Sequence, residues 1–506
     1  MNPALRLGIP LVWLLPAVAA LLVRFVIHDT RIQRLTALAT AWLVFLATIA
    51  LFVENGWGDS VTAYARDSLE SSLFSGMHFH MAVDGLNAVL LPMTAALALA
   101  LLLSIPRSDL RGDTAAQILA TESALLGCFL SLDLSLLAIF WVASLVPLWQ
   151  SIRRARDHAL HVVMSLTLGA TALATLVAVV LLAREAAAAG LAHPLDLQAL
   201  TSATSVWGRV AGGLFLFAAL LRMGIAPLHL WLTAAAGRAP GYAAMLALIT
   251  PLGSFGLARV VMPVFPELYQ QMSGPLVLLG GATALYGAML AVGQYDLRRV
   301  VGYFWISQMG LVLTGLAALN ASGVAGGLLQ SMSSVVEVGG LMLIALEVEA
   351  RAGTTDMRLL GGLVHRAPRM ATAFVLLSAA AVGFPGTVSF VAEDLAIQGL
   401  LYEHELVAST ILIVTAINGI TLFKAFKQTF LGSGSHHAKS LRAFEDLRGW
   451  EYLACLAMMG TLLVGGFMPQ PLLAIRQGVV ETVHRIEVPT HHGHGEHDEH
   501  DEHDAD

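Results

Sequence analysis

Apolar runs of about 18 to 25 residues recur along almost the whole chain, separated by short polar segments. Each run is long enough to cross a hydrocarbon core about 30 Å thick as an α-helix. The pattern therefore predicts an all-α, polytopic membrane protein. It has about fourteen transmembrane helices, centred near Pro16, Val44, Met93, Leu126, Ala138, Thr171, Leu216, Leu248, Gly281, Val312, Gly339, Ala381, Val414 and Gly460.

The composition agrees with this interpretation. Hydrophobic residues make up 57% of the 506 positions and charged residues 12%, with a mean hydropathy of +0.73; soluble domains carry about 25% charged residues. The first apolar run leads directly into a second without a small-residue cleavage site, so we expect it to be retained. Both cysteines, Cys128 and Cys455, fall in apolar segments, which argues against a disulfide framework or a thiolate metal site.

Basic residues predict the orientation, because Lys and Arg in short loops collect on the cytoplasmic side. Every second loop is basic, whereas the other set is poor in basic residues and includes the acidic segment from Glu54 to Glu70. We therefore expect a bacterial inner (cytoplasmic) membrane protein with both termini on the non-cytoplasmic side. The basic loops contain Arg31, Arg34, Arg153, Arg154, Arg156, Arg298, Arg299, Arg351, Arg358, Arg366, Arg369, Lys427, Lys439, Arg442 and Arg448.

The predicted membrane domain covers residues 1–489, and a tail rich in histidine and acids follows at 490–506. This tail cannot pack a core and is expected to be disordered. It is either a weak binder of zinc, copper or nickel or simply a solvated acidic segment. Its candidate metal ligands are His491, His492, His494 and His497.

Two predicted spans contain helix-breaking residues. Gly224 and Pro227 interrupt the seventh, and Pro385 and Gly386 interrupt the twelfth. If spans four to eight and nine to thirteen form two halves, at about 115–262 and 274–431, each break falls in the fourth helix of its half. Matching interruptions indicate two inverted five-helix repeats and an ion path near the midplane. The alternative is a pair of packing kinks.

Ionisable side chains accompany both breaks. Arg222 and His229 flank the first break, Glu393 follows the second, and Glu337 lies in the middle of another span. A charge at the bilayer centre costs about 2.5 to 3.5 kcal/mol or more, so such groups must face protein or water. We interpret them as members of a proton or ion path, in which Arg222 is a fixed cation because arginine keeps its proton. The alternative is a cation paired with a carboxylate that holds helices together.

Three further acids, Asp84, Glu122 and Asp133, are placed by the predicted boundaries nearer to span ends. Carboxylates cost less there, and helix capping or contact with another subunit is the favoured interpretation over transport.

Several motifs in succession resemble one family over about residues 75 to 475: the antiporter-like, proton-translocating membrane subunits of complex I, and its chain M type most closely. The motifs are "FHMAVDGLNAVLLPMT", "LLGCFLSLDLSLLAIFWVASLVPLW", "RMGIAPLHLWL", "DLRRVVGYFWISQMGLVLTGL", "GFPGTVSFVAEDLAIQG" and "FMPQPLL". The resemblance implies a broken seventh and twelfth helix and a chain of titratable groups between them.

The departures from the family pattern concern those titratable groups. Val142 stands where the resemblance implies a fifth-helix glutamate, and Arg222 where it implies a lysine. The eighth-helix lysine falls on Pro251 and the tenth-helix histidine on Gln308, which remains in the predicted path as a polar group. The eleventh-helix histidine falls near Ser334, close to Glu337; the twelfth-helix acid is retained as Glu393.

Three functions are compatible with these observations. In the first, the chain is a membrane subunit of a complex-I-like, energy-coupling complex with an altered or impaired proton or cation channel. In the second, it belongs to a proton-gradient-driven uptake complex for inorganic carbon (carbon dioxide or bicarbonate). In the third, it is a non-transporting scaffold. We expect other membrane subunits and soluble subunits as partners, and no nucleic acid. No cofactor is expected on this chain, which lacks a Rossmann fingerprint, a P-loop and a cysteine cluster, so any NADH-quinone oxidoreductase-like redox chemistry lies elsewhere.

Overall fold

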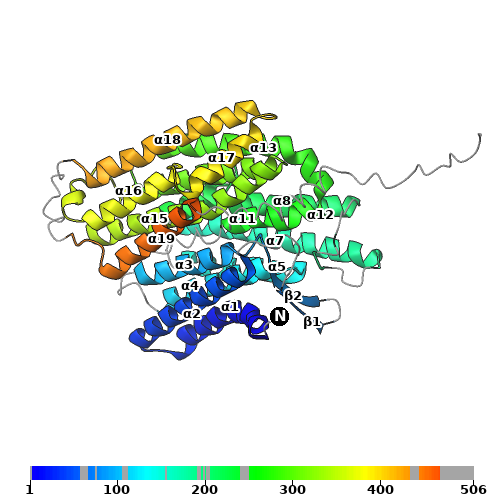
Figure 1. Cartoon of the computed structure of the whole chain (residues 1–506). Helices are drawn as coiled ribbons and strands as arrows, with labels where there is room; N and C mark the ends of the chain where they lie inside the picture. The colour runs from blue at the N-terminus through cyan, green and yellow to red at the C-terminus, as the bar shows by residue number, and fades with distance from the viewer. Residues whose placement is uncertain are drawn as a thin grey trace, which may run out of the picture.

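Helices account for nearly all of the described chain and lie side by side in one bundle (Figure 1). The computed structural model describes residues 3–56, 67–74, 77–104, 112–153, 157–190, 195–197, 200, 205–239, 250–432 and 444–467. The first half of the bundle contains α1 (Pro3–Leu21), η1 (Leu22–Val26), α2 (Thr30–Gly56), α3 (Leu90–Ser104), α4 (Gly112–Leu130), α5 (Leu134–Ala143), α6 (Leu145–Arg153), α7 (His158–Ala188), α8 (Val206–Met223), α9 (Leu230–Arg238), α11 (Pro251–Gly256), η2 (Leu257–Val261) and α12 (Met262–Val264). The remainder comprises α13 (Pro266–Val292), α14 (Leu297–Ala317), α15 (Ala321–Ala352), η3 (Leu363–His365), α16 (Pro368–Ala381), α17 (Val388–Leu400), α18 (Glu405–Phe430) and α19 (Gly449–Phe467).

The predicted spans agree with these helices. Thirteen of the fourteen predicted centres fall within a described helix, and Leu248 lies outside the described residues. Within the described part of the chain, ten segments are long and apolar enough to cross a membrane, and three apolar helices are shorter: Leu90–Ser104, Pro251–Val264 and Pro368–Ala381. The chain is a multi-pass, predominantly α-helical membrane protein.

Several helices begin at side chains that cap them. Asp133 accepts hydrogen bonds from the backbone N–H groups of Ser135 and Leu136 at the start of α5. This contact confirms the capping role predicted for Asp133 and satisfies two of the donors that every helix start leaves free. Asp157, Ser205, Asp296 and Asn320 cap α7, α8, α14 and α15 in the same way.

The centre of the bundle is formed by α14 and α15. In both helices 94% of the membrane-spanning window is buried, against 33% for α1 and α2 at the edge. Glycines allow α14 to approach α13 closely: a Cβ on Gly310 would lie 2.4 Å from the backbone N of Ala284 and 2.7 Å from the carbonyl O of Gly280. Small residues of this kind allow close backbone packing between membrane helices.

This packing predicts the effect of adding one methyl group. Gly310→Ala should lower the free energy of unfolding by about 1–3 kcal/mol, because backbone atoms of α13 cannot move aside. Gly274→Ala in α13 is the matched control, since no atom lies within 4 Å of its added Cβ. Thermal unfolding of the purified protein in detergent measures both. Equal melting temperatures for the two variants would show that the α13–α14 contact tolerates the methyl group.

Both predicted helix breaks are present. α8 ends at Met223, Gly224 adopts a left-handed φ of +73°, and α9 begins at Leu230. α16 ends at Ala381, Gly383 and Gly386 adopt φ of +69° and +95°, and α17 begins at Val388. These positive φ angles suit glycine, because it lacks a Cβ. The first break frees the carbonyl of Leu221, which accepts a hydrogen bond of 2.8 Å from the Trp231 indole.

Two features differ from the predicted all-α pattern. The fifth span, predicted as one continuous helix, is divided at Ser144 into α5 and α6. Pro147 cannot donate a backbone hydrogen bond to the Ala143 carbonyl, at which α5 ends, so it accounts for the division. An antiparallel hairpin of β1 (Asp67–Phe74) and β2 (Met77–Val83) precedes α3, with Asp67 opposite Val83. The alternation of polar and apolar residues in "MHFHMAV" is typical of a strand. The prediction was based on long apolar runs, so it did not include this short segment as a strand.

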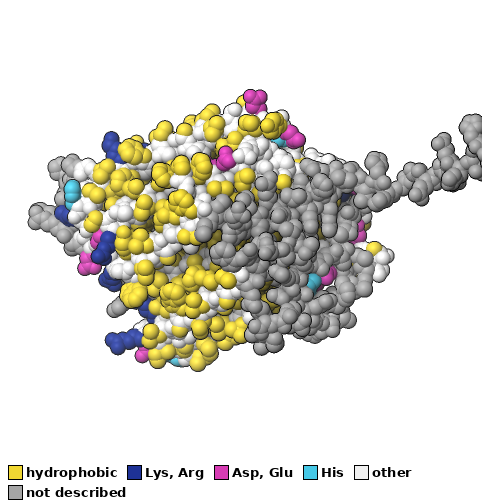
Figure 2. Space-filling view, in the orientation of Figure 1, with side chains coloured by type: hydrophobic (Ala, Val, Ile, Leu, Met, Phe, Trp, Pro, Cys, Tyr) yellow, Lys and Arg dark blue, Asp and Glu magenta, His cyan; other side chains and the backbone are white. Residues whose placement is uncertain are grey.

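Charged side chains are distributed unevenly over the surface. Lys and Arg gather at the end of the bundle where α2 begins and α18 ends, and a largely hydrophobic band lies beside them (Figure 2). On this face the described Lys and Arg side chains therefore lie mainly at one end of the bundle.

Candidate functional site

Arg222 lies at the first helix break and points to α5. Its side chain is 2% exposed, one terminal nitrogen donates to the Trp141 carbonyl O at 3.0 Å, and the other donates to the Ser144 hydroxyl. The guanidinium lies 4.7 Å from the centre of the Trp141 ring, a cation–π arrangement. Among the described residues no carboxylate forms a salt bridge with Arg222.

The division of the fifth span supplies the partners of Arg222. α5 ends next to Ser144, and this exposes the Trp141 carbonyl and the Ser144 hydroxyl to the guanidinium. Val142, at the position where the resemblance implies a glutamate, offers no oxygen from its side chain. Neutral acceptors and an aromatic ring thus replace a carboxylate, so this region holds a fixed positive charge without an acid in direct contact.

His229 belongs to the same break but contacts a different helix. Its Nε2 lies 3.4 Å from the Tyr286 hydroxyl of α13, and its Nδ1 has no hydrogen-bond partner in the described part of the chain. The seven-residue separation from Arg222 does not place both side chains on one helix face, because the helix ends between them. The described contacts of the two side chains are with separate parts of the bundle.

A buried polar line begins at Gln308 in α14. The Gln308 Nε2 donates to the Ala381 carbonyl O at the second break, 3.1 Å away, and Gln308 Oε1 accepts from Gln330 Nε2 at 2.7 Å. The Ser331 hydroxyl lies 2.5 Å from that of Ser254. All these side chains are at most 3% exposed. The Gln308–Gln330 pair joins α14 and α15 to the end of α16, and the Ser254–Ser331 pair separately joins α11 to α15.

Glu337 and Glu393 extend this line toward α18. The Ser389 hydroxyl of α17 donates to Glu337 Oε1, and Glu337 is fully buried. Ser389 and Glu393 are four positions apart in α17, so they share a helix face. The Thr415 hydroxyl of α18 donates to Glu393 Oε2 at 3.2 Å. Ser389 therefore holds Glu337 of α15 against the face of α17 that also carries Glu393.

The second break makes room for Glu393. A Cβ on Gly383 would lie 2.9 Å from Glu393 Oε2, so the carboxylate lies directly over this glycine. One oxygen of each acid, Glu337 Oε2 and Glu393 Oε1, is buried without a protein partner in the described residues. Buried acids of this kind bind water or a proton, since an isolated carboxylate in a membrane is costly.

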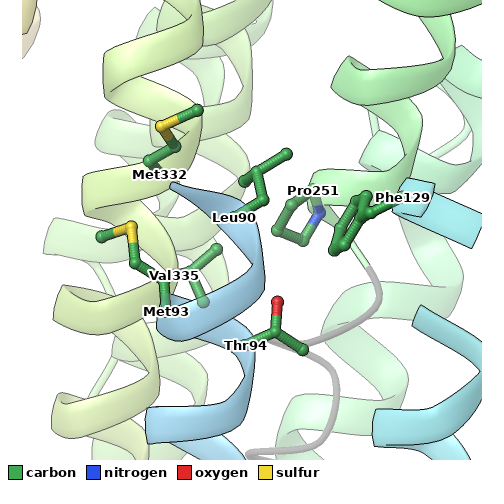
Figure 3. A pocket seen from close by; sticks show the side chains of 7 residues that line it. All are labelled: Leu90, Met93, Thr94, Phe129, Pro251, Met332 and Val335. Carbon is green, nitrogen blue, oxygen red and sulfur yellow. The ribbon is translucent and has the colours of Figure 1, made fainter. Parts of the chain in front are cut away.

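A pocket lies beside α11 and α15, the helices that carry Ser254 and Ser331 (Figure 3). It lies between α3, α4, α11 and α15, and Pro251 stands in its wall at the position where the resemblance implies a lysine. Thr94 contributes a hydroxyl to an otherwise apolar wall. The complete lining is Leu90, Met93, Thr94, Phe129, Pro251, Met332 and Val335.

Two acids differ in part from the prediction. Glu122 is not near a span end: it lies in the middle of α4 and is fully buried. Asp84 caps the turn at Leu86 and Asn87, as predicted, but it also forms a bidentate ion pair with Arg259, with distances of 2.5 and 2.8 Å. The predicted centre of the fourth span, Leu126, placed Glu122 too far toward its boundary.

Sequence reasoning missed the uncharged residues of both halves of the candidate site: Trp141, Ser144, Ser254, Gln330, Ser331, Ser389 and Thr415. A signal was present in α15, where Gln330, Ser334 and Glu337 recur at helical spacing on one face. The tail histidines His491, His492, His494 and His497 lie outside the described residues. Within the residues that the structure does describe, no group of His, Cys, Asp or Glu could hold a metal ion.

The chain is similar to known membrane proteins in both sequence and structure. The profile of the family described as "NADH:quinone oxidoreductase/Mrp antiporter, TM" matches residues 123–418. NADH-quinone oxidoreductase subunit M of Rickettsia conorii is 25% identical over 461 residues, covering 88% of this chain and 91% of the relative. NADH-quinone oxidoreductase subunit 13 of Thermus thermophilus is 29% identical over 440 residues, covering 84% and 89%. A chain of the solved respiratory complex I from Thermus thermophilus superposes with a TM-score of 0.85 at 24% identity, covering 94% of this chain and 99% of that one.

Proposed function

Since this chain belongs to the family of NADH:quinone oxidoreductase and Mrp antiporter membrane subunits, we propose that it serves an energy-coupling complex in which protons move through its second half. The second half is the region of about residues 274–431, and Glu337 and Glu393 are its proton-binding groups. One observation carries the proposal: Ser389 donates to Glu337 one helical turn before Glu393. Two acids that face each other in this way, one helical turn apart along α17, can exchange a proton through water.

The first half, about residues 115–262, has an altered channel in this proposal. Arg222 is held by Trp141 and Ser144, and the space beside Pro251 is mostly apolar. A guanidinium keeps its proton, so Arg222 supplies a fixed field and does not itself carry protons. The inorganic-carbon and scaffold functions become outcomes of the test below.

Orientation and partners belong to the same proposal. The basic end of the bundle faces the cytoplasm of a bacterial inner membrane, in accordance with the distribution of Lys and Arg (Figure 2). An even number of spans then places both termini on the other side. The relatives named above are subunits of multi-subunit oxidoreductases, which supports further membrane subunits and soluble redox subunits as partners of this chain.

Purification of the intact complex through this chain tests the proposal. We expect mass spectrometry to identify further antiporter-like membrane subunits together with flavin, iron–sulfur or quinone-binding subunits. In proteoliposomes, a potassium diffusion potential set with valinomycin should drive proton uptake, measured with an enclosed pH-sensitive dye. A zinc-binding soluble partner instead of redox subunits would favour inorganic-carbon uptake. Absence of proton movement above that of empty vesicles would leave the scaffold function.

A further inference from the structure

Glu122 is a further buried acid, and the proposed function does not use it. It is 0% exposed in α4, and neither carboxylate oxygen has a hydrogen-bond partner in the described part of the chain. An ionised carboxylate without partners is costly in such a place, so the neutral acid is the resting form. Ionisable residues within membrane spans usually serve a function rather than packing.

Two contacts define the level of Glu122 in the membrane. A Cβ added to Gly127 of α4 would lie 2.4 Å from the Phe140 ring of α5, so these two residues are neighbours. Gln117 of α4 accepts a hydrogen bond of 2.9 Å from the Ser151 hydroxyl of α6. Glu122 lies midway between Gln117 and Gly127. α4 runs antiparallel to α5 and α6. Along the helix axis, Glu122 therefore lies at the height of the midpoint between Phe140 and Ser151, and this midpoint is next to Ser144.

This is the level at which Arg222 binds. Ser144 accepts a hydrogen bond from the guanidinium, which has no carboxylate partner among the described residues. An acid without a partner and a cation without a counter-ion therefore occupy one layer of the first half.

The face of α4 that carries Glu122 also reaches the pocket. Phe129 follows Glu122 by seven positions, two helical turns or about 10 Å along the axis, and therefore shares its face. Phe129 lines the pocket opposite Met332 and Val335, with Pro251 beside it (Figure 3). The pocket lies on the side of Glu122 that is nearer the end of the bundle with few basic residues.

A row of polar side chains lies on a neighbouring face of α4, about 100° around the helix axis from Glu122, on the side nearer the basic end. Thr114, Gln117 and Thr121 recur at a spacing of three and four residues on α4, and each is at most 5% exposed. Gln117 Nε2 has no partner in the described residues, and the Thr121 hydroxyl donates to the Gln117 carbonyl O at 2.8 Å. These groups offer hydrogen bonds to water along the otherwise apolar helix.

From these juxtapositions we propose that Glu122 is the proton-binding acid of the first half, on α4 in place of the α5 position now occupied by Val142. This inference rests on the proposed function and places Glu122 in series with Glu337 and Glu393, so that loss of any one of these acids slows uptake. The Glu122 carboxyl group releases its proton to a water molecule, which becomes hydronium and passes the proton on. The remaining carboxylate then takes a proton from another hydronium ion, which restores the acid.

The test uses the intact complex in proteoliposomes and two readouts. Dicyclohexylcarbodiimide reacts with protonated carboxyl groups in apolar surroundings, and peptide mass spectrometry should find its adduct on Glu122 in the unaltered complex. Glu122→Gln should reduce potential-driven proton uptake by about tenfold or more, whereas Glu122→Asp should retain a substantial part of it. Glu403→Gln is the matched control, because Glu403 is an exposed acid between α17 and α18.

Two results would overturn the inference: absence of the adduct at Glu122, or wild-type proton uptake by Glu122→Gln in a complex of unchanged subunit composition. The labelling result stands even if the variant fails to assemble. Normal uptake in Glu122→Gln together with impaired uptake in Glu393→Gln would contradict this inference and leave the proposed function intact. Normal uptake in Glu393→Gln would contradict the proposed function itself.

Discussion

Glu393→Gln should lower potential-driven proton uptake by the reconstituted complex by about tenfold or more, because it removes a proton-binding oxygen and keeps the size of the side chain. The glutamine amide can still accept the hydrogen bond from Thr415, so α17 and α18 should remain in contact. The measurement is the initial rate of uptake, normalised to the amount of this chain in the vesicles.

Glu337→Gln should have a comparable effect, and the double variant makes the comparison sharper. If Ser389 joins both acids in one path, either single substitution blocks it, and the double variant should be no slower than the slower single variant. Rates that multiply would indicate two independent paths. Unchanged uptake in all three variants, with Glu403→Gln as the exposed control, would exclude these acids as proton carriers.

Asp84→Asn should lower the free energy of unfolding by about 3–5 kcal/mol, because it leaves the Arg259 guanidinium buried without its counter-ion. The two side chains are 8% and 5% exposed and form two short contacts. Asparagine retains an oxygen that can accept from the Leu86 and Asn87 backbone N–H groups, so the turn before α3 should persist. Thermal unfolding of the purified protein in detergent measures the loss.

An exposed ion pair supplies the control for this prediction. Arg358 and Asp356 also form a salt bridge, at 2.7 Å, but the arginine side chain is 64% exposed. Water screens this pair, so Asp356→Asn should change the melting temperature far less. Similar losses for Asp84→Asn and Asp356→Asn would mean that the buried pair makes no special contribution to stability.

Hydrophobic run length predicted most of the fold for a simple reason. A membrane span must satisfy its own backbone hydrogen bonds, so its length and apolar character are local properties. The two breaks were equally local, since Gly224 and Gly383 adopt conformations that suit glycine. The division at Ser144 also has a local marker, Pro147, which cannot donate to the Ala143 carbonyl. It accompanies the contacts of Trp141 and Ser144 with Arg222, a residue from a distant part of the chain.

Apart from Gln308, which the resemblance supplied, the members of the candidate site that were predicted are ionisable residues. Glu337, Glu393 and Arg222 are conspicuous because ionisable groups are rare in apolar segments. Ser389, Thr415 and Gln330 are not, because hydroxyl and amide side chains are common in membrane helices and become informative only through their partners. Glu122 was assigned to a span boundary, because the precise ends of α4 depend on packing against neighbouring helices.

The sequence by itself determined that this chain is a membrane protein of many helices, where two of them break, and that Arg222, Glu337 and Glu393 belong to apolar segments. These properties follow from solvation, which acts on each segment separately. The tertiary structure alone decided which groups meet: Arg222 with neutral acceptors, Glu337 with Ser389, and Glu122 with no partner among the described residues. Such pairings depend on the register and rotation of packed helices, which arise from contacts between residues far apart in the chain.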